Sequence, residues 1–511
     1  MKILTSREAR LVDDHTMTHL GVSGEALMGR AGLAVAEKAK KMLLEMGRNR
    51  VIIICGKGNN GGDGYAAALR LRDFNVDVSI LSTVSEKEIT GEARTYHDGC
   101  VQHKLPVQYK VDAGDADLSN HDLVIDALLG TGVKGEVRPE AAGWIDSINK
   151  LETPVLAIDI PSGISSDSGQ ILGTAVRSEA TVTMGFLKQG LVMNPGASMS
   201  GELTVADIGY PEEAFQAVEI EKALIEESLA QTLLTKPPVD TYKHRQGKVL
   251  ILAGSKGFTG AGCLASEGAL RSGAGLVIAG VPESINAIYE SKLTEVITAP
   301  IPDGGTGHYD SDSLDHLQVQ LEWCDVVAIG PGIGTLPAVQ QFARALFETV
   351  SRPFVIDADA LKVFHGDLDA FRAMKAPFVI TPHYGEASAL FGVSKEEILI
   401  DPFSFVHESA RKIGGVMVLK GAPTLISDGL SVMANKSGHQ GLATGGSGDV
   451  LTGVIAGFLA QGISAYMAAQ LGVFIHGRAA DFLKDSHGYR GMIAGDLLKA
   501  LPSVISAYEH G

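Results

Sequence analysis

The chain has 511 residues, more than one hydrophobic core usually supports, so we expect two domains. Its 45% hydrophobic and 20% charged residues are typical of a folded globular protein and exclude a largely disordered chain. The formal net charge of −17 excludes a polyanion-binding surface, so we expect no nucleic-acid partner, and any recognised phosphate should belong to a small ligand in a local pocket.

The N-terminus and the cysteines indicate the compartment. Residues 1–10 carry charges and lack an apolar signal core, so we expect a cytoplasmic protein. The four cysteines are scattered without a CxxC pair, which is typical of buried thiols in a reducing compartment and does not indicate a zinc site.

The first half of the chain alternates between helical and strand patterns. A helix is expected after Thr5 and Ser6, with Glu8 in its first turn, and a longer helix from Ser23 to Met46. Apolar runs predict strands at 51–55, 76–81, 123–128 and 155–158, and a closing strand at 202–209. This alternation predicts a doubly wound parallel α/β sheet, in which ligands bind beyond the carboxyl ends of the strands.

Three of these strand ends carry unusual sequences. The first continues into GKGNNGGDG at 56–64, a glycine-rich loop at a helix start that is neither a P-loop nor GxGxxG. The next contains Asp126 and continues into the glycine-rich loop 130–136, and the third continues into DIPSG at 159–163. Each polar residue alone is better explained as a turn residue or a satisfied strand-end carboxylate, but three on one sheet edge favour a ligand site.

Asn60, Asp126 and Ser162 supply oxygen ligands of low total charge. Such a set suits a monovalent cation better than a divalent one. We therefore predict a monovalent-cation site at this edge of the sheet.

The motifs GKGNNGGDG, DALLGTGVKG and DIPSG, in this order, resemble the N-terminal epimerase domain of bifunctional NAD(P)H-hydrate repair enzymes. The resemblance covers most of residues 1 to about 215 and implies a Rossmann-like three-layer sandwich, so we assign residues 1–220 to an epimerase domain. It implies that Asn60, Asp126 and Ser162 bind potassium and that Asp159 acts on the reacting ring. At Val133 the family usually has another aliphatic residue. The implied hydrate-binding residues are Asn59, Asn60, Gly61, Gly62, Asp63, Gly130, Thr131, Gly132, Val133, Lys134, Gly135, Glu136 and Asp159.

A second α/β alternation follows the segment Lys236-Pro237-Pro238, where we place the domain junction. It begins with a strand at 247–253 and the loop 254–262, and further strands are predicted at 276–280, 326–330, 354–357, 378–381 and 416–420. The strand ends again carry the informative sequences, namely GPGIG at 330–334, DADA at 357–360, TPHYGE at 381–386 and KGAPT at 420–424. His383 or Lys420 alone could be a structural or solvated residue, but their shared edge favours a site.

The segment ATGGSGDV at 443–450 precedes an apolar helical run. Its glycines can present backbone N–H groups to a phosphate at the positive end of a helix dipole. Asp449 would lie beside that phosphate, which makes it a candidate base, and the alternative is a glycine turn with Asp449 as helix N-cap. Because Gln461, Ser464 and Gln470 interrupt the apolar stretch up to Ile475, we expect two buried helices separated near Gly462 and no membrane span.

The combination HxGE, KGxxT and TGGSGDVL resembles the ADP-dependent NAD(P)H-hydrate dehydratase branch of the ribokinase-like superfamily. The resemblance covers about residues 225–508, which we assign to a ribokinase-like α/β domain. It implies Asp449 as the base. Pro423 departs from the pattern, because it has no backbone N–H to donate to a phosphate. The implied adenine-nucleotide contacts are Lys420, Gly421, Ala422, Pro423, Thr424 and Gly448, and the implied hydrate contacts are Ala261, Gly332, His383 and Asp449.

These resemblances imply a fused repair enzyme that epimerises hydrated NADH and NADPH, and dehydrates the S form with ADP as co-substrate. We also expect a magnesium ion, although no carboxylate cluster identifies its ligands, and a homo-oligomer. Two alternatives remain, a kinase of a vitamin-like alcohol fused to a non-catalytic ligand-binding module, and a nucleotide-sensing protein without turnover. The residue Glu386 after His383, in place of a sugar-kinase carboxylate pair near the entrance loop, weighs against the kinase.

Overall fold

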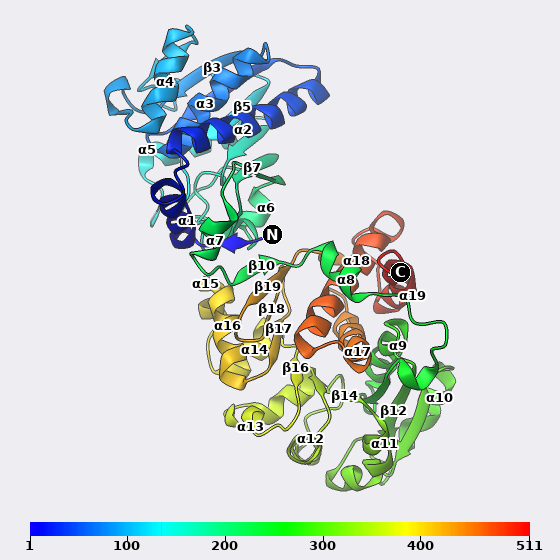
Figure 1. Cartoon of the computed structure of the whole chain (residues 1–511). Coiled ribbons are helices and arrows are strands. Elements are labelled where there is room, and N and C mark those ends of the chain that lie inside the picture. The colour runs from blue at the N-terminus through cyan, green and yellow to red at the C-terminus, as the bar shows by residue number, and fades with distance from the viewer. Residues whose placement is uncertain (134, 511) are drawn as a thin grey trace. The chain divides into compact units, whose positions relative to one another are not determined.

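The computed structural model describes residues 1–133 and 135–510, and these form two compact units, Met1–Lys222 and Ala223–Gly511 (Figure 1). The boundary precedes the Lys236-Pro237-Pro238 segment at which the sequence suggested a junction. β10 (Lys222–Leu224) is a neighbour of β19 (Val432–Asn435) in the sheet of the second unit, and α8 (Glu227–Leu233) packs against α18 (Ala465–His487). Strand pairing and helix packing therefore define the boundary, and the prolines lie within the second unit.

The first unit contains a seven-stranded sheet in which every pairing is parallel. The strand predictions at 51–55, 76–81, 123–128, 155–158 and 202–209 are confirmed with small shifts, whereas β4 and β7 were not predicted. A separate two-stranded parallel pair joins β1 (Ile3–Leu4) to β8 (Leu187–Lys188). In sheet order the seven strands are β4 (Val107–Tyr109), β3 (Asp77–Ser82), β2 (Arg50–Cys55), β5 (Leu123–Ala127), β6 (Val155–Ile158), β7 (Ala180–Met184) and β9 (Glu202–Ala206).

Helices cover both faces of this sheet, as a three-layer α/β unit requires (Figure 1). Ile53 of β2 belongs to the core formed with α2 and α3, whereas its neighbours Ile52 and Ile54 belong to the core formed with α5. The predicted capping box is confirmed, because Thr5 accepts from the Glu8 N–H and Glu8 accepts from the Thr5 N–H. The helices are α1 (Ser6–Thr18), α2 (Gly24–Met46), α3 (Asn59–Asp73), α4 (Glu92–Gln102), α5 (Pro139–Asn149), α6 (Gly196–Met199) and α7 (Glu212–Gln216).

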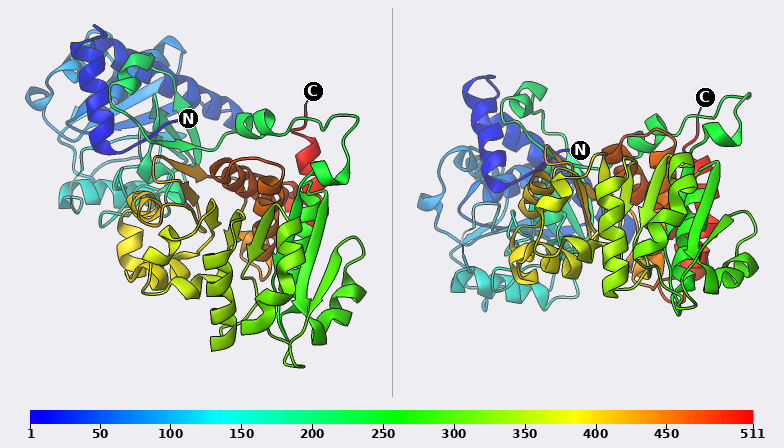
Figure 2. Two further views of the ribbon diagram at one scale, coloured as in Figure 1. Left: turned by 60° about the horizontal axis from the view of Figure 1, so that its bottom comes forward. Right: turned by 90° about the horizontal axis from the view of Figure 1, so that it is seen from below.

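The second unit contains a ten-stranded mixed sheet with helices on both faces (Figure 2). The strands from β13 to β17 pair in parallel, and β17, β18 and β19 form an antiparallel end. The six predicted strands are confirmed, and they include β17, whereas β10, β13, β18 and β19 were not predicted. The remaining strands in sheet order are β18 (Thr424–Ser427), β17 (Val416–Leu419), β16 (Phe378–Ile380), β15 (Phe354–Ile356), β14 (Val326–Ile329), β11 (Lys248–Leu252), β12 (Leu276–Pro282) and β13 (Ile297–Ile301).

The central helix of this unit is α17 (Ser447–Ala460), which is buried from Val450 to Leu459 between α9 (Thr259–Arg271), α18 and the sheet. Glycines permit this close packing, because a Cβ on Gly453 would lie 2.0 Å from the Ala265 carbonyl oxygen. The predicted break near Gly462 is confirmed, and none of the described helices has the length and apolar composition of a membrane span. The other helices are α10 (Asn286–Lys292), α11 (Gln318–Trp323), α12 (Pro337–Thr349), α13 (Asp369–Arg372), α14 (Tyr384–Phe391), α15 (Lys395–Ile400), α16 (Pro402–Ile413) and α19 (Ala494–Ser506).

Both sheets reverse their strand order once. In the first, the chain proceeds from β2 through β3 to β4 on one side and from β5 to β9 on the other. In the second, it proceeds from β11 through β12 to β13 on one side and from β14 to β17 on the other. Ligands of doubly wound sheets bind at such switch points, so the loops after β2 and β5 and those after β11 and β14 are the places to examine.

Candidate active sites

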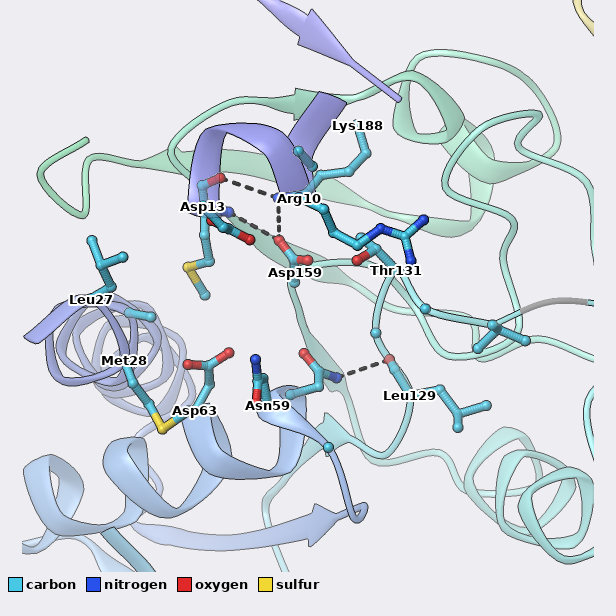
Figure 3. A pocket seen from close by; sticks show the side chains of 18 of the residues that line it. Arg10, Asp13, Leu27, Met28, Asn59, Asp63, Leu129, Thr131, Asp159 and Lys188 are labelled. Carbon is cyan, nitrogen blue, oxygen red and sulfur yellow. Dashed lines mark hydrogen bonds and ion pairs between the residues drawn. The ribbon is translucent and has the colours of Figure 1, made fainter. Parts of the chain in front are cut away.

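A pocket of about 810 Å³ opens at the switch point of the first unit (Figure 3). Its walls come from α1, α2, the start of α3, the loop after β5 and the residue after β6. A volume of this size accommodates a dinucleotide-scale or smaller ligand. The predicted hydrate-binding residues that line it are Asn59, Asn60, Asp63, Gly130, Thr131, Gly132, Val133, Glu136 and Asp159.

Of the other predicted hydrate-binding residues, those that the structure describes, Gly61, Gly62 and Gly135, do not line the pocket. Gly61 and Gly62 are buried in the first turn of α3, where a Cβ on Gly61 would lie 2.0 Å from the Gly56 carbonyl oxygen and one on Gly62 would lie 2.6 Å from the Met28 methyl group. These two glycines permit close packing at the start of α3. Gly135 has a φ of +73°, and Lys134 lies outside the described residues.

Asn60 and Ser162 both bind the backbone of Leu129 at the pocket, and Asp126 binds Ser162. Asn60 Nδ2 donates to the Leu129 carbonyl at 2.9 Å, and the Leu129 N–H donates to Ser162 Oγ at 2.8 Å. Ser162 also donates to both oxygens of buried Asp126, through Oγ at 2.6 Å and through its N–H at 2.8 Å. Burial raises the pKa of Asp126.

Asn60 Oδ1 is buried and has no hydrogen-bond partner among the described residues. A buried carbonyl-type oxygen without a donor costs free energy unless a cation or a water satisfies it. The oxygen-only donor set and this unpartnered atom fit a monovalent cation, so the structure brings the predicted cation ligands together.

Asp159 follows β6 directly and has a φ of +66°, a left-handed conformation that aspartate adopts more readily than most residues. Its Oδ1 accepts from buried Lys188 Nζ, from Thr183 Oγ1 at 3.2 Å and from the Met184 N–H at 3.2 Å. Its Oδ2 accepts no hydrogen bond in the described part of the chain. The contacts fix one oxygen of Asp159 and leave the other available to a ligand (Figure 3).

The sequence did not identify Lys188, Asp13 or Tyr210, which also line this pocket. The Tyr210 hydroxyl donates to Asp13 Oδ1, and burial raises the pKa of both groups. Lys188 is the last residue of β8, the short strand after β7, and neither strand was predicted. Asp13 comes from α1, which lies outside the strand-end pattern. The alternation of threonine with apolar residues in ATVTM at 180–184 is the signal that could have located Lys188.

In the second unit, the segment TGGSGD forms the start of α17. Gly446, with φ +91°, is the N-cap, and no side chain caps this helix end. The alternative that Asp449 is the helix N-cap is therefore wrong, since Asp449 lies within the first turn. Burial and the nearby Asp357 carboxylate raise the pKa of Asp449 to about 6, with Lys420 acting in the opposite direction. Asp449 can thus change protonation near neutral pH, as a general base requires.

Lys420 lies beside this helix start. Its Nζ donates to Asp357 Oδ1 at 2.7 Å, and a Cβ on Gly448 would lie 3.5 Å from that Nζ. Thr452, one turn into α17, donates to Asp357 Oδ2 at 2.8 Å. The structure therefore brings Lys420, Gly448 and Asp449 together. It adds Asp357, from the strand-end segment 357–360, and Thr452, which was not predicted.

His476 of α18 packs against the same start of α17. It is buried, and its ring lies beside the backbone of Ser447, the first residue of α17. Burial lowers the pKa of His476 to about 4, so the ring is neutral at physiological pH. Its Nε2 has no partner in the described part of the chain.

His383 has a structural role that its motif did not reveal. Its Nδ1 accepts from the Gly385 and Glu386 N–H groups at 2.9 and 3.1 Å, and Glu386 accepts from the His383 N–H at 2.8 Å, so HxGE forms a capping box for α14. Because Nδ1 accepts, Nε2 carries the proton of the neutral ring, and it lies 3.6 Å from Glu386 Oε1. His383 also forms a β-bridge with Lys420, which places it at the same edge.

Ala261 and Gly332 are neighbours at the switch point of the second sheet. A Cβ on Gly332 would lie 3.1 Å from the Ala261 Cβ and 2.9 Å from the Phe258 Cβ. Ser255 Oγ donates to the Gly332 carbonyl at 2.8 Å, joining the loop after β11 to the loop after β14. The predicted hydrate contacts Ala261 and Gly332 thus share one wall.

The remaining nucleotide motif, Lys420 to Thr424, forms the turn between antiparallel β17 and β18. Thr424 Oγ1 donates to the Gly421 carbonyl at 3.0 Å, which closes this turn. The Ala422–Pro423 bond is cis, and Pro423 contributes no N–H. Among the residues described, no three His, Cys, Asp or Glu side chains form a group that could hold a metal ion.

Comparisons with known proteins match both units. A family model described as NAD(P)H-hydrate dehydratase matches residues 249–503, and one described as YjeF-related protein N-terminus matches residues 24–190. The bifunctional NAD(P)H-hydrate repair enzyme Nnr of Moorella thermoacetica is 37% identical over 100% of this chain and 97% of its own length. The enzyme of the same name from Thermofilum pendens is 34% identical over 99% and 97%.

A solved structure gives the fold of the second unit independently. A ribokinase-like superfamily protein from Enterococcus faecalis superimposes with a TM-score of 0.50 at 25% identity, over 57% of this chain and 98% of that one. The expected ribokinase-like α/β fold of the second unit is therefore confirmed.

Proposed function

Because the chain belongs to the family of bifunctional NAD(P)H-hydrate repair enzymes, we propose that its first unit interconverts the R and S epimers of hydrated NADH or NADPH and that its second unit dehydrates the S epimer with ADP. The observation that carries this proposal is the match of curated repair enzymes along essentially the whole chain. The two switch-point sites, one in each unit, support two activities.

In the second unit, the start of α17 holds the phosphates of ADP. Its unpaired N–H groups and the positive end of its dipole attract anions, and Lys420 adds a cation beside Gly448. The contacts with the adenine nucleotide come from Lys420, Gly421, Ala422, Pro423, Thr424 and Gly448. Pro423 has no N–H, so its neighbours donate the backbone hydrogen bonds.

Asp449 is the base of the dehydration. It removes the proton from the ring hydroxyl of the hydrate, and the hydroxyl oxygen attacks the β-phosphoryl group of ADP, which releases AMP. Phosphate then leaves from the ring carbon, the adjacent ring carbon loses a proton to the departing phosphate or to water, and the C=C bond of NAD(P)H forms again. Ala261, Gly332 and the uncapped half of His383 hold the hydrate against Asp449.

In the first unit, the pocket at the start of α3 holds the same hydrate, and Asp159 acts on its ring. Asn60, Asp126 and Ser162 hold a potassium ion, which the unpartnered Asn60 Oδ1 supports. A bound potassium ion would supply positive charge beside buried Asp126. A magnesium ion in the second unit would neutralise charge on the nucleotide phosphates, and we place the protein in the cytoplasm as a homo-oligomer.

The experiment is to incubate purified S hydrate with the protein and ADP, ATP or no nucleotide, and to follow the absorbance of reduced nicotinamide and the formation of AMP. We expect absorbance to recover with ADP, with one AMP per NAD(P)H. Turnover with ATP and none with ADP, or a stable phosphorylated product, would support the kinase alternative, and tight binding without turnover would support the sensor.

A further inference from the structure

Two carboxyl groups in the pocket of the first unit have opposite surroundings. Asp159 Oδ1 receives three donors, Lys188 Nζ, Thr183 Oγ1 and the Met184 N–H. Lys188 is itself held by Thr183 Oγ1 at 3.0 Å and the Met184 carbonyl at 3.1 Å. Donors to a carboxylate stabilise its ionised form, so Asp159 is organised as an anion with Oδ2 free.

Asp63 receives no donor. It is half-buried on α3, and no hydrogen bond or ion pair reaches its carboxyl group from the residues described. The Met28 side chain lies beside it (Figure 3). Burial, followed by repulsion from Asp159, raises the pKa of Asp63 well above its usual range, against the opposing charge of Lys188. Asp63 is therefore organised as a neutral acid.

The other charged groups of the pocket do not take this role. Asp13 faces the same space but accepts from the Tyr210 hydroxyl, so a donor already occupies it. The remaining charged groups are three cations and two anions, and none of these five pairs with Asp63. They are Arg10, Lys57, Arg138, Glu92 and Glu136.

A protein that inverts the hydroxyl-bearing carbon of the hydrate needs an acid and a base together. In a hydrated dihydronicotinamide that carbon is bonded to the ring nitrogen, so loss of the hydroxyl proton can open the ring to an aldehyde. The nitrogen must accept a proton in the same step, because the electron pair of the broken C–N bond goes to it. Pairs of carboxyl groups held in opposite protonation states perform such transfers.

We propose that Asp63 is the acid and Asp159 the base of ring opening and closure, with Lys188 as a positioning residue for Asp159. Asp159 Oδ2 takes the hydroxyl proton as C=O forms and C–N breaks, and Asp63 gives its proton to the nitrogen. The aldehyde rotates about its single bond to the carbon chain and presents its other face. The nitrogen then attacks that face, its proton returns to Asp63, and the oxygen takes back the proton from Asp159. This assignment rests on the proposed epimerase function.

The test uses the full chain without ADP, so that only epimer exchange proceeds, and measures conversion of pure S hydrate to R by chromatography. We expect Asp63→Asn and Asp159→Asn each to lower the exchange rate constant by about 10²-fold or more with little change in KM. The double variant should lose little more than either single one, since the two groups act as a unit. Asp14→Asn, an exposed aspartate on α1, is the matched control.

Three readouts separate an acid from a structural residue. Asp63→Asn should melt at an unchanged or higher temperature, because Asp63 makes no hydrogen bond that the change could break. The wild-type rate should fall at alkaline pH as Asp63 loses its proton, and Asp63→Asn should lack this alkaline limb. Lys188→Met should lower kcat with little change in KM, and Lys188→Arg should restore part of the rate, because the donor that holds Asp159 Oδ1 is lost in the first variant and replaced in the second.

Wild-type-like exchange by Asp63→Asn, or a wild-type profile without an alkaline limb, would overturn the proposal, and the second result does not depend on whether any variant folds. Exchange by the wild-type chain no faster than in buffer would instead overturn the epimerase function itself.

Discussion

Lys420 Nζ donates a hydrogen bond of 2.7 Å to Asp357 Oδ1, and this pair lies beside Asp449 at the start of α17. Asp357 is 1% exposed, and Thr452 binds its other oxygen at 2.8 Å, so the pair is rigidly held. Of its two charges, Asp357 raises the pKa of Asp449 and Lys420 lowers it. The protonation of the proposed base is thus set by two residues that need not contact the hydrate.

The dehydration rate should depend on pH through this arrangement. A base acts only when ionised, and the pKa of Asp449 is raised to about 6, so kcat/KM should fall as pH drops through about 6. Asp357→Asn removes the repulsion and should move this acidic limb to lower pH. Lys420→Met removes the attraction and should move it to higher pH. The measurement is kcat/KM for S hydrate from pH 4.5 to 8 in all three proteins. If the rate falls at the same pH in all three, the group that titrates is not Asp449.

Asp449→Asn tests the base directly. The variant cannot accept the hydroxyl proton, so dehydration should fall by about 10²-fold or more. Removal of a negative charge beside the nucleotide phosphates relieves repulsion, so ADP affinity should be unchanged or higher. The measurements are dehydration rate and ADP dissociation constant on one preparation, with the epimerase rate as control for a folded chain. Near-normal dehydration would exclude Asp449 from the chemistry.

Potassium should occupy the site at the pocket of the first unit. Asn60 Oδ1, Asp126 and Ser162 Oγ provide oxygen ligands with a single formal charge, which suits a monovalent ion. Crystals soaked in a thallium salt should show an anomalous peak among these three residues. A peak elsewhere, or a site that binds magnesium in preference to potassium, would contradict the assignment.

The two activities should be separable. Residues 1–222 and 223–511 each contain a complete sheet with helices on both faces. The first fragment should exchange epimers and the second should dehydrate S hydrate with ADP. A first fragment that is folded by circular dichroism but inactive, while the full chain exchanges epimers, would show that the division of labour is wrong.

The strand ends were the most predictable part of the fold and of both sites. Long buried strands such as β2 and β5 appear as apolar runs, and the parallel topology places their carboxyl ends at one edge. This was sufficient to bring Asn60, Asp126 and Ser162 together from three separate motifs. It also brought Lys420 to Gly448 and Asp449 in the second unit.

The pocket residues that the sequence did not reveal are brought to the pocket by contacts between segments far apart in the chain. Lys188 follows a strand of alternating threonines that has no apolar run, and Asp13 reaches the pocket from α1, whose position depends on tertiary contacts. The roles of His383 and Asp449 at helix ends were also ambiguous in the sequence. The structure shows that His383 caps α14 and that Asp449 does not cap α17.

The most direct test of two linked activities starts from the pure R epimer of hydrated NADH, with ADP and the full chain. The account predicts that S hydrate appears transiently, that the absorbance of reduced nicotinamide recovers completely, and that Asp159→Asn slows this recovery to the rate of spontaneous epimer exchange. The account would be contradicted if the wild-type chain consumed added S hydrate but the R epimer disappeared no faster than by spontaneous exchange.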